Sequence, residues 1–489
     1  MLSPSRGKRS ALHQVSSLTL RLVLLLAPLL VLLVPGEAQA YHWMIKHGYP
    51  TCGGCHTDPS GGELLTFYGR TLSEAVLSTP WGGSGEGATA MRPLPRPRLA
   101  RSPSSFAARP KLADKDGVAE EKIELEEDAA PEGDKPAADA ESTEASAAEA
   151  APAPAAEEEG DGSGSIAPFL FGLWEPPDWL LLGGSYRHMN IITPQSAEKF
   201  RTFPMMMDVY GQAQFGSFKV GGSLGAARVP TGSPYARPAQ ITANQGDQWN
   251  LISRTHYIGY DITTDLQVRA GRLNLPFGVR IPEHTMWARM ATRTDRESSQ
   301  QHGVSVTYNH ESFRFELMGI AGNYQINPDR YRERGYSGYF EYYVTPKTVL
   351  GVSSLVTVAG EDRVVQDKAS MTRMAHGGIL RNVVNESFMF VLEANALVRS
   401  RYDVGYVGFA QADFEATQGL HFMLTGELLD EGHSRALDAP ARLPGAGKPK
   451  VGGWLSACWW FLPHFDVRID GIQRTGEDLS ILAQLHAYL

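Results

Sequence analysis

Cysteine is scarce in this sequence, with three residues among 489. So few cannot build the disulfide framework that stabilises small secreted domains. Long apolar runs are also scarce, because nothing after Ala40 is long enough for a transmembrane helix. Basic residues are outnumbered by acidic residues, 45 to 54, which argues against nucleic acid as a partner. The hydrophobic fraction of 42% is too low for a helical membrane protein, but it permits a transmembrane barrel, whose strands alternate apolar and polar residues.

The one long apolar run lies near the N-terminus. Several basic residues precede the run 22–34, and Ala38-Gln39-Ala40 follows it. A basic start, an apolar stretch and a small-x-small site are together typical of a secretory signal peptide. We therefore predict that residues 1–40 are a cleaved signal peptide and that the mature protein is exported. An uncleaved anchor is the alternative, but the run is short for a bilayer span.

Composition divides the remaining chain into three parts. Residues 41–80 hold two of the three cysteines, Cys52 and Cys55. Residues 81–165 are rich in Pro, Ala and Glu and lack the apolar and aromatic residues that would offset chain entropy, so we predict a disordered linker. A flexible coil of about 85 residues would span roughly 50 Å. Residues 166–489 alternate in hydrophobicity, as β-strands do.

The strand pattern has a strict period of two, with turn residues between segments. Charged residues fall on one face of four segments and apolar residues on the other. The charged positions are Arg314 and Glu316; Glu393 and Arg399; Asp413 and Glu415; and Asp466, Arg468 and Asp470. A soluble β-sandwich would bury the apolar face, whereas a transmembrane barrel would turn it to lipid and the charged face to a watery lumen.

Four features favour the barrel. Counting segments predicts an all-β, transmembrane antiparallel β-barrel of about 16 strands, within a range of about 14 to 18. Short turns such as Gly216-Ser217 interleave with longer connections such as residues 230–249. The last segment alternates to the apolar terminal residue Leu489. Aromatic residues cluster near predicted strand ends, as interfacial girdles would require: Tyr336, Tyr339, Tyr342 and Tyr343, and Trp454, Trp459 and Trp460.

One stretch is similar to a known barrel family. Residues 268–278 read Val-Arg-Ala-Gly-Arg-Leu-Asn-Leu-Pro-Phe-Gly and resemble the G-x-x-x-x-P-F segment of phosphate-selective porin-type porins. The resemblance implies a porin-like barrel. Counting alternately from a periplasmic N-terminus makes loop 276–296 the third outside loop, and in many porins that loop folds inward to narrow the channel. Four arginines lie on this loop: Arg280, Arg289, Arg293 and Arg296. Two interpretations stand, a basic constriction and an ordinary solvated loop.

The motif Cys52-Gly53-Gly54-Cys55-His56 has the C-x-x-C-H pattern of c-type haem attachment. Two thiols at this spacing reach the vinyl groups along one porphyrin edge, and the next imidazole then lies beneath the iron. A zinc half-site would need further ligands, and a redox pair would need a surrounding βαβ fold. We predict one covalent haem c on Cys52 and Cys55, with His56 as proximal iron ligand. Cys458 is interpreted as a small buried hydrophobe on a strand.

The sixth iron position has three candidates before the motif, His42, Met44 and His47. Histidine gives a lower reduction potential and methionine a higher one. We favour the two histidines as distal ligands ahead of Met44, and the sequence does not separate them. A vacant sixth position is a further alternative.

The residues after the motif, through Tyr68-Gly69-Arg70, extend a second resemblance. They are similar to the C-x-x-C-H-x-x-P-x-G-G-x-L-x-x-Y-G-R pattern of monohaem cytochrome segments at the start of bacterial outer-membrane proteins. We predict a tight turn from Pro59 to Gly62 over the haem edge. Arg70 has two interpretations, a partner of a haem propionate and a plain surface charge.

Together these features indicate an outer-membrane porin–cytochrome fusion that takes part in electron transfer and is not an enzyme. The resemblance implies outer-membrane lipid and periplasmic or multihaem cytochromes as partners, with the haem segment on the periplasmic side. One haem cannot bridge an apolar core of about 30 Å. Either partner cytochromes fill the barrel, or the haem docks in its mouth as one station of a relay. The alternative function is a channel for small solutes with a haem-bearing plug or redox sensor. A haem peroxidase is disfavoured, because segment 41–80 leaves little room for a substrate pocket.

Overall fold

The computed structural model describes residues 43–47, 51–80, 176–229, 237–242, 244, 248–283, 285–323, 332–362, 369–433 and 447–488. The predicted signal peptide, the predicted linker and the candidate ligand His42 lie outside these residues. No helix among them is both long and apolar enough to cross a membrane.

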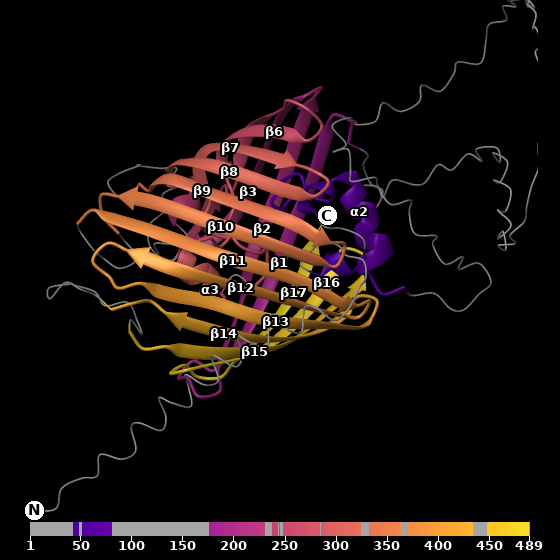
Figure 1. Cartoon of the computed structure of the whole chain (residues 1–489). Helices are drawn as coiled ribbons and strands as arrows, with labels where there is room; N and C mark the ends of the chain where they lie inside the picture. Colours follow the sequence, from indigo (N-terminus) through magenta and orange to yellow (C-terminus); the bar gives the residue numbers. More distant parts are fainter. Residues whose placement is uncertain are drawn as a thin grey trace, which may run out of the picture. The chain divides into compact units, whose positions relative to one another are not determined.

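The alternating segments form one closed antiparallel sheet (Figure 1). Strand β1 pairs with β2 on one side and with the last strand, β17, on the other, which closes the ring. Strands β4 and β5 both pair with β3, so they share one position in the ring. The barrel therefore has sixteen strand positions. The all-β barrel of about sixteen strands is therefore confirmed. The strands are β1 (Leu180–Ile192), β2 (Phe200–Phe215), β3 (Phe218–Val229), β4 (Gln248–Ile252), β5 (His256–Asp261), β6 (Leu266–Leu273), β7 (Gln301–Asn309), β8 (Phe313–Gly322), β9 (Arg334–Thr345), β10 (Thr348–Ala359), β11 (Met371–Asn385), β12 (Phe388–Arg399), β13 (Gly405–Thr417), β14 (Leu420–Asp430), β15 (Lys450–Leu462), β16 (Phe465–Arg474) and β17 (Ser480–Tyr488).

The barrel is apolar outside and charged inside. On β12, Phe390 is 40% exposed whereas Glu393 is 2% exposed. Likewise, Leu424 of β14 is 63% exposed whereas Asp413 of the neighbouring β13 is 1% exposed. All nine charged positions predicted to share a face are buried. A soluble sandwich would show the reverse, because it hides its apolar face. The sandwich alternative is therefore wrong.

Exposed aromatic side chains border the outward apolar surface near strand ends. The predicted girdle residues Tyr336, Tyr342 and Trp459 do face outward, but Tyr339, Trp454 and Trp460 are buried. Alternation places neighbours of an outward residue inside, so a run of aromatics is divided between the two faces. Further exposed aromatics near strand ends are Phe200, Phe203, Phe215, Phe218, Trp249, Tyr260, Tyr406, Phe414 and Phe422.

The two ends of the barrel differ. The turns after β2, β7, β9, β11, β13 and β15 are short and gather at one end, hereafter the short-turn end. The connections at the other end are longer. Among those that the structure describes in full or with a single residue missing, the longest runs between β6 and β7. This is the alternation of connection lengths predicted from the sequence.

The connection between β6 and β7, residues 274–300, folds into the lumen as the porin resemblance implied. It carries the short helix α3 (Trp287–Thr292), whose side chains are buried except that of Met290. The backbone N–H of Trp287 donates to Glu427 of β14 at 2.6 Å, and the Arg289 guanidinium forms an ion pair with Glu393 of β12. Arg293 pairs with Asp362 at 2.8 Å. The ordinary solvated loop is therefore wrong. These two arginines are neutralised by carboxylates of β12 and of the connection that follows β10. Residues 274–300 are called the inward loop below.

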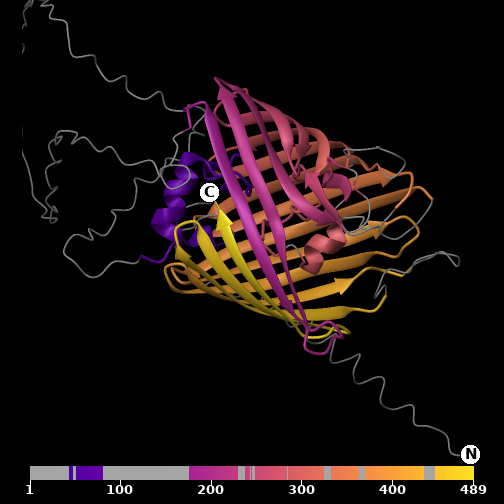
Figure 2. The same cartoon turned by 180° about the vertical axis from the view of Figure 1, so that it is seen from behind.

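The N-terminal segment 43–80 lies in the lumen at the short-turn end (indigo in Figures 1 and 2). It contains η1 (Met44–His47), η2 (Cys52–Gly54), α2 (Phe67–Leu72) and η3 (Ser73–Leu77). One of its ends reaches the β13–β14 and β15–β16 turns, where Thr79 Oγ1 donates to Gln418 O at 3.1 Å and accepts from Trp459 Nε1 at 2.9 Å. Segment 43–80 therefore lies inside the barrel, against inward-facing residues of its strands.

Candidate functional site

A single turn presents the three side chains of the C-x-x-C-H motif. The N–H groups of Cys55 and His56 both donate to Cys52 O, at 3.2 and 3.0 Å, so the chain winds tightly through η2. His56 then pairs with Leu65 in an isolated antiparallel bridge. Thr66 N donates to Cys55 O at 2.9 Å and closes a loop from 55 to 66. The motif is thus fixed by local backbone hydrogen bonds.

The loop turns over at Gly61-Gly62, as predicted for residues 59–62. Asp58 Oδ1 accepts from the Ser60 N–H and hydroxyl, both at 2.9 Å, and Gly61 N donates to Asp58 O. Gly61 and Gly62 have φ of +88° and +94°, which L side chains rarely adopt. A Cβ on Gly61 would also lie 3.0 Å from Cys52 Sγ. The double glycine therefore allows the turn to pack against the Cys52 thiol.

Helix α2 packs directly on the motif. Thr66 caps it by accepting from Gly69 N at 3.0 Å. Gly69 lies so close to Cys55 that a Cβ would overlap the Cys55 carbonyl oxygen. Arg70 is buried and donates to Leu182 O of β1. The interpretation of Arg70 as a plain surface charge is therefore wrong, because the side chain is buried and anchors the helix to the barrel wall. Its pairing with a haem propionate stays a prediction.

Two opposing walls hold the segment. Toward β13, Lys46 Nζ lies 2.7 Å from Asp413 Oδ1 and 3.2 Å from Glu415 Oε2, and His47 Nε2 lies 3.1 Å from Glu415 Oε2. Trp43 packs between His421 and Trp460, with ring centroids 4.3 and 4.8 Å away.

Toward β6, Asp58 pairs with Arg269 at 3.2 Å and accepts from Asn274 at 2.8 Å. Glu63 accepts from Thr255 and Asn274. Strands β6 and β13 stand seven positions apart in a ring of sixteen, because β4 and β5 share one position. The segment therefore bridges the lumen from wall to wall.

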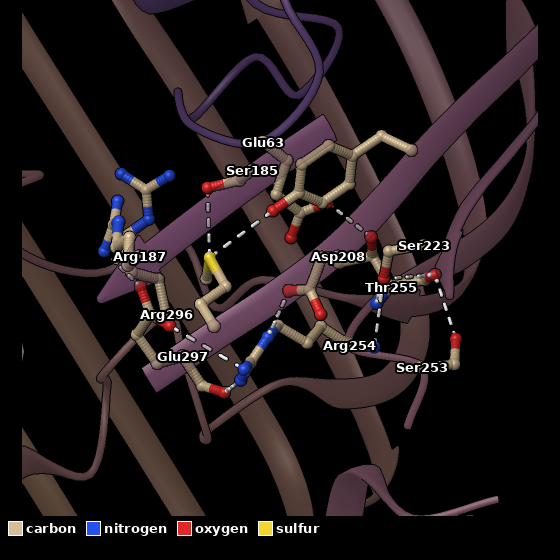
Figure 3. A network of polar contacts seen from close by, with 12 residues as sticks. Glu63, Ser185, Arg187, Asp208, Ser223, Ser253, Arg254, Thr255, Arg296 and Glu297 are labelled. Atoms are coloured by element: carbon tan, nitrogen blue, oxygen red, sulfur yellow. Dashed lines mark hydrogen bonds and ion pairs between the residues drawn. The ribbon is translucent and has the colours of Figure 1, made fainter. Parts of the chain in front are cut away.

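The wall beside Glu63 is a connected polar network (Figure 3). The strand position shared by β4 and β5 is interrupted here, and Ser223 Oγ accepts from the N–H groups of Arg254 and Thr255 at 3.0 Å. The interruption turns Arg254 toward Asp208, which it contacts at 2.7 Å. Glu297 of the inward loop joins by pairing with Arg187 at 2.7 Å. The network ties the inward loop to β1 and β2 next to the C-x-x-C-H motif.

Cys52, Cys55 and His56 line one cavity of about 1830 Å³, a volume that includes its opening to solvent. Apolar side chains from the segment and the walls also line it, among them Leu65, Leu72, Phe277 and Trp460. Seven arginines line the same cavity: Arg187, Arg254, Arg280, Arg296, Arg314, Arg381 and Arg468. Cys458 also lines it from β15 and is 3% exposed, which fits its interpretation as a buried strand residue.

Burial controls the protonation of the segment's titratable groups. It lowers the pKa of His56 to about 4, with help from Arg296, so the imidazole is neutral and able to bind a metal. Burial raises the pKa of Glu63 to about 7. Burial alone would also raise the pKa of Asp58, but Arg269, Arg280 and the Asn274 hydrogen bond together hold it well below the ordinary value.

The candidate distal ligands lie in different places. His47 is bound to Glu415 through Nε2 and does not line the cavity. Met44 is 5% exposed and does line it. Two further methionines of the walls, Met206 and Met423, line the cavity as well. The sequence pointed only to residues near the motif, so these wall methionines were missed.

A covalently held haem fits the residues present. Cys52 and Cys55 are free thiols on one turn, and His56 Nδ1 is buried without a hydrogen-bond partner among the described residues. The apolar lining suits a porphyrin face, and the arginines suit its carboxylates. When bound, the haem would supply one-electron redox chemistry. The protein would supply the thioether anchors Cys52 and Cys55 and the neutral imidazole of His56.

Comparisons with known proteins give no family. No family profile matches the sequence, and no curated protein matches it. Solved structures with similar barrels include the DcaP channel of Acinetobacter baumannii, at 11% identity and a TM-score of 0.42, covering 63% of this chain and 97% of that one. OmpT of Vibrio cholerae is 10% identical with a TM-score of 0.45, and the match covers 63% of this chain and 99% of that one. Salmonella typhi OmpF, in complex with daunomycin, is 13% identical with a TM-score of 0.44, and the match covers 63% of this chain and 97% of that one. The barrel of this chain is established by its own strand pairing.

Proposed function

We propose that the chain is an outer-membrane barrel carrying one covalent haem c inside its lumen, where the haem serves as an electron-transfer station. The observation that carries this proposal is the placement of Cys52, Cys55 and His56 on one cavity within a barrel that is apolar outside. An apolar outward surface bordered by aromatics suits lipid. The short-turn end, which holds the haem segment, would face the periplasm.

The docking of segment 43–80 supports a fixed station in place of a freely swinging domain. Lys46 and His47 hold one side, and Asp58 and Glu63 hold the other. A buried ion pair costs several kcal/mol to break when one partner is lost, so the docked state would persist. One haem in the short-turn half of the barrel cannot cross an apolar core of about 30 Å alone. A periplasmic or multihaem cytochrome would therefore complete the relay.

A solute channel is the second candidate, and the same docking observation bears on it. Segment 43–80 bridges the lumen, and the inward loop reaches it from the other side, with Arg280 Nη2 donating to Ser60 Oγ at 2.6 Å. Conduction would then pass through the arginine-lined cavity and be restricted by the segment. In this case the haem would mark a plug or redox sensor.

Reconstitution in liposomes distinguishes the two. Liposomes loaded with a reduced redox dye receive the purified protein, and an outside acceptor is added with and without a multihaem cytochrome. Dye oxidation that requires both the haem and the cytochrome supports electron transfer. Passage of ions or sugars that is independent of haem redox state supports the channel instead. Cys52→Ala/Cys55→Ala removes the attachment thiols, and Cys458→Ala is the matched control, because Cys458 lines the same cavity outside the motif.

A further inference from the structure

We infer that Arg280 and Arg296 of the inward loop form a carboxylate-binding site that holds the haem propionates, an inference that rests on the proposed function. Both arginines line the cavity of the C-x-x-C-H motif. Neither belongs to the N-terminal segment, so the haem would be gripped from two parts of the chain separated by more than two hundred residues.

Both guanidinium groups lie against the glycine turn of the haem segment. Arg280 Nη2 donates to Ser60 Oγ at 2.6 Å and to Leu275 O at 2.7 Å. The Arg296 guanidinium occupies the space where a Cβ of Gly62 would lie. A Cβ on Gly61 would lie 4.0 Å from Arg280 Cγ and 3.0 Å from Cys52 Sγ. The glycine turn thus brings Arg280 close to Cys52 and places Arg296 against Gly62 of the same turn.

These two arginines differ from the other five in the cavity. Arg254 pairs with Asp208 at 2.7 Å, Arg314 with Glu316 at 2.5 Å, and Arg381 with Glu341 at 2.5 Å. Arg187 pairs with Glu297 and Arg468 with Glu283, both at 2.7 Å. Within the described part of the chain, Arg280 and Arg296 have no carboxylate at ion-pair distance.

The nearest acids of the segment are already engaged. Asp58 is held by Arg269 and Asn274, and Glu63 by Thr255 and Asn274. Two cations largely removed from water with no carboxylate in direct contact are costly, so an external anion is expected here.

A carboxylate is the anion that suits the site. The guanidinium fork matches the two oxygens of a carboxylate and forms short, charge-assisted hydrogen bonds with it. A haem held by Cys52 and Cys55 brings two propionate carboxylates into this cavity, one for each arginine. A free carboxylate solute passing through the lumen would use the same chemistry, and the experiment separates these two sources.

The test uses the full-length protein in detergent, with Arg280→Gln, Arg296→Gln and the double variant. Haem staining on a denaturing gel first establishes attachment in each. Resonance Raman spectra then report hydrogen bonding of the propionates, and redox titration reports the ratio of oxidised to reduced haem. We expect all variants to keep the haem, the double variant to lose the hydrogen-bonded propionate signature, and each lost cation to shift the redox equilibrium roughly tenfold toward the oxidised form. Arg201→Gln is the control, because Arg201 is exposed on β2 and pairs with Glu198.

A haem-positive double variant with an unchanged propionate signature would overturn the inference. Absence of haem from the unaltered protein would instead overturn the proposed function. Succinate binding identifies the source of the carboxylate. We expect the haem-free Cys52→Ala/Cys55→Ala protein, shown to be folded by its heat-modifiable gel mobility, to bind succinate through Arg280 and Arg296, and the haem-loaded protein not to. Arginine-dependent succinate binding by the haem-loaded protein would assign the site to a solute and contradict the propionate assignment.

Discussion

Lys46→Met should loosen segment 43–80 from the barrel wall. The Lys46 side chain has no exposed surface, and its ammonium lies between Asp413 and Glu415 at 2.7 and 3.2 Å. Removing one partner of a buried ion pair costs about 3–5 kcal/mol. The lower end applies here, because His421 remains bound to Asp413 and His47 to Glu415, both at 3.1 Å. A loss of about 3 kcal/mol corresponds to a roughly hundredfold weaker docking equilibrium.

Amide hydrogen exchange measures this opening directly. The N–H groups of Thr57, Thr66 and Arg70 are hydrogen-bonded within the segment. We expect their protection to fall roughly a hundredfold in Lys46→Met, while β11 and β12 keep theirs. Lys219→Met is the matched control, since Lys219 forms a similar wall pair with Asp261 at 2.7 Å. Unchanged protection of the segment in Lys46→Met, or an equal loss in the control, would refute the docking argument.

Three further predictions concern the segment itself. Gly69→Ala should destabilise the segment by about 1–3 kcal/mol, because a Cβ would overlap the Cys55 carbonyl. Gly53→Ala should change exchange protection little, because its Cβ would meet Pro59 Cα at an ordinary 3.5 Å, and equal effects of the two variants would contradict the close packing of α2 on the motif. Burial raises the pKa of Glu63 from 4.5 to about 7, so the folded form prefers the protonated acid. Relative to Glu63→Gln, the unaltered protein should lose docking stability as the pH rises from about 4.5 to 7, by on the order of 3 kcal/mol at most. Identical pH profiles of exchange protection in the two proteins would rule this out. Met44→Leu should change the haem absorbance spectrum and lower the reduction potential, because Met44 lines the cavity. His47→Gln should leave both unchanged, because His47 Nε2 binds Glu415, and the opposite result would assign the sixth iron position to His47.

The barrel was largely predictable because its rule is local. Period-two alternation places Glu393 and Asp413 inside and Phe390 outside, whatever the distant contacts are. The interruption between β4 and β5 was not predictable in this way. It depends on Ser223 bonding to the backbone at Arg254, thirty-one residues away.

The motif was predictable for the same local reason, since the spacing of Cys52, Cys55 and His56 defines its chemistry. Its surroundings were not. Lys46 meets Asp413 across 367 residues of sequence, and nothing in either local pattern pairs them. Likewise, the sequence marked Arg280 and Arg296 only as basic loop residues. Their place beside Gly61 and Gly62 follows from the inward folding of the loop together with the docking of the segment.

The most direct test of the proposed function is haem content in the folded barrel. The protein is purified from outer membranes of cells that mature c-type cytochromes, and it is run unheated and heated on a denaturing gel with haem staining, alongside an intact-mass measurement. We predict a faster unheated band, haem stain in both bands, and a mass that exceeds that of the chain from Tyr41 by one haem. A heat-modifiable barrel with neither stain nor added mass would contradict the assignment of Cys52, Cys55 and His56.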